Sequence, residues 1–260
     1  ERRLAELFAE RVAATLDHLR LAAEVRSAGR AKEDFLLIAS HEMRSPVAAL
    51  QVELHGLGVA LGEGNMDRAR ERGRAVRDLG DRLEDLVNNL LDDARLSGGR
   101  FELRREVLDL RDVAEMAARR FEETARRRGI ALRVGGGRLL GRWDRMVVEQ
   151  AIANLLSNAL RFGAGQPVDV DVSFRDDRAA ARVTVRDRGP GIAPDDLPRL
   201  FHRFSRLDNG VGGLGLGLFV VRSLVEAHGG RVYVESTPGQ GTAFAFELPL
   251  APVADESRET

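Results

Sequence analysis

Apolar residues recur every three or four positions through the first third of the chain, which is the spacing of an amphipathic α-helix. One such series runs from Phe35 to Leu61, and a second runs from Val76 to Leu90. The Gly-rich segment LGEGN, residues 61–65, separates the two series. The pattern therefore predicts two long helices joined by a short turn, which together make a helical hairpin.

The apolar stripe on each predicted helix is narrow, so one hairpin alone leaves an apolar seam uncovered. A second copy of the hairpin would cover the seam and complete an antiparallel four-helix bundle, which predicts a homodimer. A further apolar series lies between Leu4 and Leu19. It predicts a connecting helix over residues 1–33, which we expect to pair with its twin.

After the segment LSGGR the pattern changes, and short β-rich runs with alternating apolar residues are separated by helical stretches. A period of two predicts an antiparallel or mixed sheet with one buried face. Helices covering that face would give an α+β chain in which the hairpin precedes an α/β two-layer sandwich. The polar residues 251–260 are expected to form a frayed tail. Strands are predicted at 101–107, 130–134, 168–174, 180–187, 231–236 and 242–249, and helices at 110–128, at 144–162 and after Gly215.

Composition excludes several classes of protein. The 260 residues include 40 Lys+Arg and 41 Asp+Glu, so charge gives no reason to expect nucleic acid or a membrane surface as the main partner. Lys32 is the only lysine, which excludes a phosphate-binding loop of the GKS or GKT type. Without cysteine there is no disulfide, thiolate nucleophile or Cys-based metal site. No apolar run approaches the ~18 residues of a membrane span, and the chain lacks an initial Met, so we expect a soluble fragment of a longer protein, with any membrane anchor upstream. The absence of cysteine permits a reducing compartment, and the cytoplasm is the location that we expect for this fragment.

Two glycine-rich segments are candidates for a nucleotide site. Asp187 ends a predicted strand and is followed at once by Gly189 and Gly191, so a fixed carboxylate lies beside backbone that an adenine could approach closely. An ordinary Asp-Gly turn is the alternative. Glycines at 210–217 lead into an apolar helix, where unpaired amides can bind an anion. A flexible surface loop is the alternative there.

The predicted helix at 144–162 carries Asn154 and Asn158, which lie four residues apart and therefore on one face. Asparagine is a poor helix former, so two on one face require a reason. Their amide oxygens suit Mg²⁺, which prefers oxygen ligands and accompanies phosphates. Two capped or solvated amides are the alternative.

The segment SHEMRSP places His41 beside Glu42 in the first hairpin helix. A neutral imidazole nitrogen is a competent nucleophile near neutral pH, because its unperturbed pKa is about 6.5, and an adjacent carboxylate can take or orient the ring proton. Pro46 removes a helix hydrogen bond one turn later, and we expect it to loosen the helix there. The alternative is a solvated helix histidine, which is our prediction for His18, His55, His202 and His228.

In order, the segments SHEMRSP, NLLSNALRF, DRGPGI, LPRLFHRF, GLGLGL and GQGT resemble the motifs of the sensor histidine kinases of bacterial two-component systems, over about residues 34 to 250. The resemblance implies a signal-transmitting connector at 1–33, a dimerisation and histidine phosphotransfer domain at 34–98, and a tail at 251–260. The domain at 99–250 would bind ATP, with the fold of the gyrase, chaperone, histidine kinase and MutL group. ATP and Mg²⁺ would phosphorylate a histidine, and the phosphoryl group would pass to an aspartate of a response-regulator receiver domain.

The resemblance also implies residue roles. His41 would accept the phosphoryl group, and Glu42 would be its acid–base neighbour. Ser45 stands where the family usually has threonine or asparagine, a position tied to dephosphorylation, so phosphatase activity stays open. Asn158 would hold Mg²⁺, with Asn154 beside it. The remaining nucleotide contacts would come from Arg161, Phe162, Asp187, Gly189, Gly191, Gly213, Leu214, Gly215, Leu216 and Gly217, while Phe201 and Phe204 would either border the lid or only pack.

Two rival functions remain open. A plain ATPase of the gyrase or chaperone type uses a carboxylate where Asn154 stands, and an amide cannot accept a proton from water. A catalytically silent module that docks a partner through its bundle would leave no acid-labile, base-stable phosphate on His41. These motifs do not specify the input signal, the cognate regulator, or whether phosphorylation occurs within or between protomers.

Overall fold

The computed structural model describes residues 40, 43–97, 103–175, 179–205 and 215–250. The chain divides into two compact units, Glu1–Leu86 and Val87–Thr260. The predicted connecting helix at 1–33 and the tail at 251–260 lie outside the described residues. In the part of the chain that is described, every helix is too short or too polar to cross a membrane.

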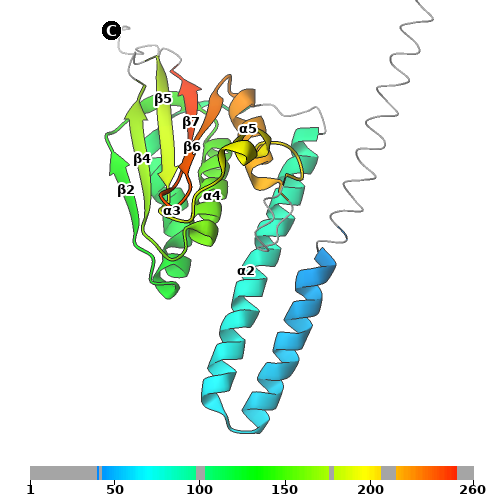
Figure 1. Ribbon diagram of the computed structural model, residues 1–260. Helices are drawn as coiled ribbons and strands as arrows, with labels where there is room; N and C mark the ends of the chain where they lie inside the picture. The colour runs from blue at the N-terminus through cyan, green and yellow to red at the C-terminus, as the bar shows by residue number, and fades with distance from the viewer. Residues whose placement is uncertain (1–39, 41–42, 98–102, 176–178, 206–214, 251–260) are drawn as a thin grey trace, which may run out of the picture. The chain divides into compact units, whose positions relative to one another are not determined.

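The predicted helical hairpin is present (Figure 1). It makes up the described part of the first unit, and the end of its second helix extends past Leu86 into the second unit. Residues 43–62 are helical and α2 (Met66–Ser97) follows, so the turn lies within LGEGN as predicted. Gly64 has a φ of +71°, in the left-handed region that glycine adopts without strain. The side-chain oxygen of Asn65 accepts a hydrogen bond from the Arg68 amide at 3.1 Å, which caps the start of α2.

The two hairpin helices bury few side chains against each other. In the described part of this unit the buried residues are Pro46, Ala60, Ala69 and Leu86. Most of these are small, so the area removed from water between the helices is modest.

The predicted apolar stripe on the first helix is largely uncovered. Val47, Leu54 and Leu61 keep 42%, 48% and 53% of their surface exposed. The helices are also joined by an ion pair, in which Arg72 Nη1 donates to both carboxylate oxygens of Glu53 at 2.9 and 2.8 Å. The hairpin therefore presents an apolar surface that this protomer does not cover.

The second unit holds a five-stranded mixed sheet and a separate two-stranded sheet. The larger sheet has the order β2-β4-β5-β7-β6, in which β2 runs parallel to β4 and the other neighbours are antiparallel. The smaller sheet pairs β1 with β3. The strands are β1 (Glu106–Asp109), β2 (Leu132–Gly136), β3 (Leu140–Trp143), β4 (Val168–Phe174), β5 (Ala180–Arg186), β6 (Arg231–Thr237) and β7 (Gly241–Pro249).

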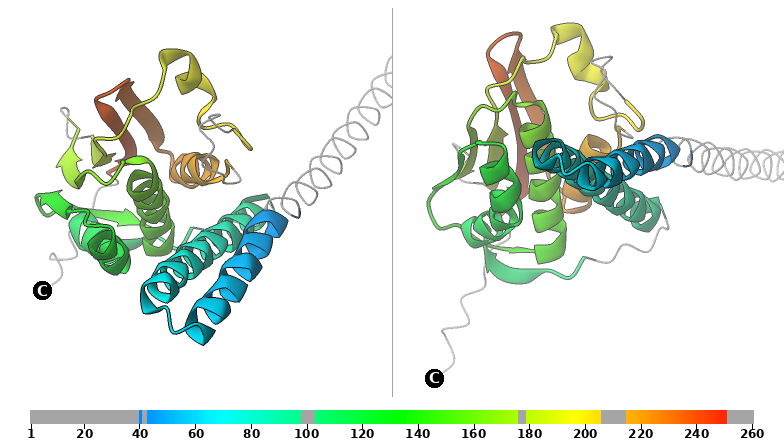
Figure 2. Two further views of the ribbon diagram at one scale, coloured as in Figure 1. Left: turned by 60° about the horizontal axis from the view of Figure 1, so that its bottom comes forward. Right: turned by 90° about the horizontal axis from the view of Figure 1, so that it is seen from below.

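Three helices cover one face of the larger sheet, which gives the predicted two layers (Figure 2). Alternate residues of the central strands face these helices and are buried, such as Val183 of β5 and Phe246 of β7. Ile152, fully buried, comes from the central helix of the layer. The helices are α3 (Leu110–Arg127), α4 (Arg145–Phe162) and α5 (Gly217–Ala227), and a short 3₁₀ helix, η1 (Pro194–Arg199), follows β5.

The other face of the sheet carries a buried carboxylate, Glu247 of β7, whose charge is matched locally. It accepts hydrogen bonds from Arg182 Nε at 3.0 Å and from the Tyr233 hydroxyl at 3.0 Å, and it forms an ion pair with Arg175 at 3.5 Å. Burial favours the neutral acid, but the hydrogen bonds from Arg182 and Tyr233 and the charges of both arginines outweigh it and lower the pKa of Glu247. Glu247 is therefore held in its ionised form on this face of the sheet.

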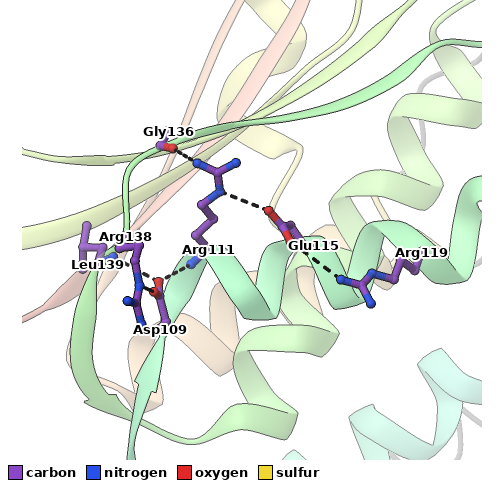
Figure 3. A network of polar contacts seen from close by, with 7 residues as sticks. All are labelled: Asp109, Arg111, Glu115, Arg119, Gly136, Arg138 and Leu139. Carbon is purple, nitrogen blue, oxygen red and sulfur yellow. Dashed lines mark hydrogen bonds and ion pairs between the residues drawn. The ribbon is translucent and has the colours of Figure 1, made fainter.

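Asp109 joins the smaller sheet to the start of α3 (Figure 3). Its carboxylate accepts hydrogen bonds from the Arg111 amide at 3.1 Å, the Leu139 amide at 3.0 Å and Arg138 Nε at 2.8 Å. Burial opposes the charge, but these hydrogen bonds outweigh burial and lower the pKa of Asp109. The acid thus caps α3 and at the same time holds the residues that lead into β3.

The smaller sheet was not predicted. β1 begins at Glu106, five residues later than the predicted strand, and β3 was missed altogether. β3 ends at Trp143, which is 1% exposed and whose indole nitrogen donates to Pro249 O at 3.1 Å. A side chain at Gly141 would overlap the indole ring, so glycine is required beneath it.

Candidate functional site

Asn154 and Asn158 lie on one face of the helix α4, as the sequence predicted. Asp144 caps the helix by accepting from the Val147 amide at 3.2 Å. Asn154 is 8% exposed and Asn158 is half-buried one turn later, on the same face. Among the described residues, nothing accepts a hydrogen bond from the buried Nδ2 of Asn154. A buried amide donor without an acceptor is costly, so this face is suited to a ligand that supplies one.

Asp187 lies directly after β5, one residue beyond the observed end of a strand that was predicted to include it, and is 6% exposed. Its Oδ1 accepts from the Gly189 amide at 2.8 Å, and its own amide donates to Thr242 O at 2.9 Å. Burial raises the pKa of Asp187, and backbone hydrogen bonds from Gly189 and Thr242 offset only part of that effect. The carboxyl is thus held in one orientation at the end of the sheet.

The predicted glycines bring the Asp187 loop against α4 and the β6–β7 turn. A side chain at Gly189 would overlap Phe162 O, at the end of α4. Gly191 has a φ of +71°, and a side chain there would overlap Thr237 O, at the end of β6. These approaches place the Asp187 loop, the end of α4 and the β6–β7 turn side by side.

The glycine-rich segment before α5 is described only in part, because Gly213 and Leu214 lie outside the described residues. Gly215 has a φ of +64°, and a side chain there would overlap Ser205 O. Leu216 is 1% exposed, and α5 begins at Gly217 without a side-chain cap. The prediction that the first amides of this helix bind an anion stays a prediction.

Three aromatic residues were predicted to lie near the nucleotide or its lid, and they differ in their surroundings. Phe201 contacts the core residue Phe244 edge-on, with ring centroids 6.3 Å apart, which favours the packing role. The Arg203 guanidinium lies over the ring of Phe204 at 5.9 Å. Phe162 is 40% exposed, and the Arg161 guanidinium lies over its ring at 5.2 Å. The backbone of Phe162 lies beside the Asp187 loop, where a side chain at Gly189 would overlap its carbonyl oxygen.

His41 and Glu42 lie outside the described residues, and their roles stay predictions. Ser45 is exposed in the helix just after them, and Pro46 is buried within the same helix.

The prediction for His228 was wrong, since it is 3% exposed rather than solvated. Its Nε2 accepts from the Asp144 amide at 3.1 Å, and its Nδ1 donates to Leu224 O at 3.2 Å in the tautomer that satisfies both contacts. Burial lowers the pKa of His228, and the charge of Arg105 adds to that effect. The ring therefore joins the end of α5 to the start of α4. His55 and His202 are exposed, as predicted.

Comparison with known proteins gives two family matches. Residues 31–99 match the His Kinase A (phospho-acceptor) domain. Residues 143–252 match the family described as histidine kinase-, DNA gyrase B- and HSP90-like ATPase.

Individual relatives match nearly the whole chain. The histidine protein kinase DivJ of Caulobacter vibrioides is 35% identical over 246 residues, which are 92% of this chain and 40% of that protein. The alginate biosynthesis sensor protein KinB of Pseudomonas aeruginosa is 34% identical over 230 residues, 87% of this chain and 38% of that protein. The chain thus spans about two fifths of the length of these relatives. The crystal structure of full-length ShkA with AMPPNP is 28% identical with a TM-score of 0.59, and covers 84% of this chain and 46% of that one.

Proposed function

Because this chain belongs to the sensor histidine kinase family, with a phosphoacceptor domain followed by an ATPase-like catalytic domain, we propose that it phosphorylates its own His41 from ATP. The phosphoryl group then passes to an aspartate of a response-regulator receiver domain. We assign the phosphotransfer domain to residues 34–98 and the catalytic domain to residues 99–250.

The observation that carries the proposal is the buried amide of Asn154, which has no acceptor among the described residues. It lies on the α4 face that leads to Phe162, and the end of α4 touches the loop after Asp187. A nucleotide placed with its base at Asp187 and its phosphates along this face would supply the missing oxygen acceptor. A relative solved with AMPPNP supports the same class of ligand.

Mg²⁺ would be held by the amide oxygen of Asn158, together with oxygens of the substrate. The residues fit, because Asn158 is half-buried one turn from Asn154 on the same face and offers the hard oxygen ligand that Mg²⁺ prefers. The ion would neutralise charge on the phosphates during transfer.

The chemistry assigned to the first unit follows from its residues. A neutral ring nitrogen of His41 attacks the γ-phosphorus as the bond to the bridging oxygen breaks and ADP leaves. Glu42 takes the proton from the other ring nitrogen, so the phosphoimidazole forms as a neutral ring. Ser45 is exposed and keeps a hydroxyl, and we propose that it can orient a water molecule that hydrolyses the aspartyl phosphate of the response regulator and releases phosphate. Asn154 cannot act as a base toward water, which disfavours simple ATP hydrolysis.

The homodimer is supported by the exposed stripe Val47, Leu54 and Leu61, whose burial against a second hairpin would remove apolar surface from water. For the receiver domain, we propose a separate face of the same helix. Val52 and Val59 are 65% and 43% exposed and lie one heptad apart, 11 and 18 residues after His41. At ~3.6 residues per turn, spacings of 11 and 18 residues would place Val52 and Val59 on the same helix face as His41.

The decisive test is incubation with γ-labelled ATP and Mg²⁺. We expect a phosphate that survives base, is lost in acid, and is absent from His41→Gln. Asp187→Asn should abolish labelling by removing nucleotide binding, while leaving the His41 helix unchanged. Labelling that survives His41→Gln undiminished would contradict the assignment of the acceptor.

A further inference from the structure

The helix-facing side of the central strands is apolar until its last row. Val185 of β5 and Val234 of β6 flank Phe244 of β7 in register. In the next row on the same side, the residues are Asp187, Thr242 and Ser236. Ser236 pairs with Thr242 in the β6–β7 register, and the Asp187 amide donates to Thr242 O at 2.9 Å. The row of residues nearest the Asp187 loop is thus polar.

Ser236 connects the elements around this row with a single hydroxyl. Its oxygen accepts from the Ile192 amide at 2.8 Å, at the end of the Asp187 loop. The same hydroxyl donates to Gly241 O at 3.0 Å, at the start of β7. Its third contact is Thr242 Oγ1 at 2.9 Å. One donor and two acceptor sites are the full capacity of a hydroxyl, so Ser236 is saturated by the protein.

These contacts fix the direction of the Thr242 hydroxyl. The only proton on the Ser236 oxygen goes to Gly241 O, because a carbonyl has no proton to give. All three contacts can be hydrogen bonds only if Thr242 donates its proton to Ser236. Thr242 is 6% exposed, and its remaining lone pairs can then only accept. Beside it stands the Asp187 carboxylate, which also accepts when ionised.

We propose that Ser236 is a positioning residue that makes this row a pure acceptor and thereby selects a 6-aminopurine nucleotide over a 6-oxopurine one. The inference rests on the proposed nucleotide site at Asp187. An adenine presents an amino donor, which two acceptors bind, whereas a guanine presents a carbonyl acceptor, which they repel. Without the Ser236 hydroxyl, Thr242 is free to turn its proton toward the base and to donate to a guanine carbonyl.

The test measures the dissociation constants of ADP and GDP for the whole chain and for Ser236→Ala. We expect the GDP-to-ADP ratio to fall about tenfold in the variant, the effect of one redirected hydrogen bond of ~1.4 kcal/mol. Ser236→Thr keeps a hydroxyl at a strand position and should restore most of the ratio. Ser173→Ala, a half-buried serine on the uncovered face of the same sheet, should leave both constants unchanged.

A merely structural serine gives a different result. If Ser236 only holds the loop, Ser236→Ala weakens ADP and GDP equally, the ratio stays constant and the inference is overturned. If Ser236→Ala does not fold, Thr242→Val removes the hydroxyl that reads the base while keeping its shape, and a constant ratio there overturns the inference as well. If the unaltered chain binds neither nucleotide, the proposed function itself fails, and the inference fails with it.

Discussion

The hairpin and the sheet unit bury their apolar residues in different ways. In the hairpin, large residues such as Leu54 and Leu61 remain about half exposed, and Leu86 is the one large aliphatic side chain of the described unit that is buried. In the sheet unit, Phe246 and Ile152 are almost completely buried within one continuous core. The difference indicates that the sheet unit is stabilised within one chain, whereas the hairpin gains stability when another surface covers its stripe. The effect of substitutions in the hairpin should therefore depend on protein concentration, whereas the effect of substitutions in the sheet unit should not.

The largest expected effect is on association. Leu54→Asp places an unpaired charge in the proposed dimer seam, and we expect the dimer dissociation constant to rise at least ~100-fold, since burying such a charge costs several kcal/mol. Analytical ultracentrifugation measures this constant. His55→Asp adds the same charge one position along, on an exposed residue outside the stripe, and should have little effect. An undisturbed dimer in Leu54→Asp would show that the stripe is not the seam.

The next effect concerns the core of the sheet unit. Phe246→Ala should lower its free energy of unfolding by ~3–5 kcal/mol through lost burial and an unfilled cavity. Urea denaturation followed by circular dichroism measures this loss, which should not depend on protein concentration. Phe174→Ala, at a residue 45% exposed, is the matched control. A concentration-dependent loss in Phe246→Ala would contradict the contrast between the units.

A smaller effect is expected at the corner where Asp109 caps α3. Asp109→Ala removes a cap and leaves the Leu139 amide without its acceptor, so stability should fall by ~2 kcal/mol. Asp112→Ala, an exposed acid in the first turn of the same helix, should cost much less. Equal losses in these two urea titrations would mean that helix charge, rather than the cap of Figure 3, stabilises the corner.

The smallest effect is a pH dependence. The pKa of His228 is lowered in the folded state from 6.5, so the unfolded chain takes up the proton first as the pH falls. Its contribution is complete above about pH 6.5 and declines below that value, at a slope of at most ~1.4 kcal/mol per pH unit. Asp109 and Glu247 have lowered pKa values, so their contributions are lost only below the ordinary carboxyl range. The free energy of unfolding, measured between pH 5 and 7, should lose this pH dependence in His228→Gln. An unchanged slope would show that His228 is not its source.

Long periodic stretches were predicted well from sequence. The β4 strand was predicted with its observed bounds and α4 within one residue, because each has a consistent period and clear flanking turn residues. Gly189 and Gly191 were singled out as glycines that let another group approach closely, and the structure shows such approaches to protein backbone. Their contacts with a nucleotide stay predictions. The parallel β2–β4 pair was left open between antiparallel and mixed, since pairing direction depends on chain connections rather than on local pattern.

Contacts between distant segments were not predicted. β3 is four residues long and contains Gly141, so it has too little alternation to be recognised. His228 resembles a surface histidine in sequence, and only the approach of the Asp144 amide reveals its role. Ser236 did leave a signal, because it is a polar residue where the alternation of Val232 and Val234 predicts a buried apolar one.

The buried indole at the end of β3 has a practical consequence for separating the two units. Trp143 is the only tryptophan of the chain and Tyr233 the only tyrosine, and both belong to the sheet unit. Tryptophan fluorescence, excited at long wavelength, therefore comes from the sheet unit and from no residue of the hairpin. Because the indole nitrogen donates to Pro249, emission will shift to the red when the end of β7 detaches, and a unit that melts first can be identified without any label.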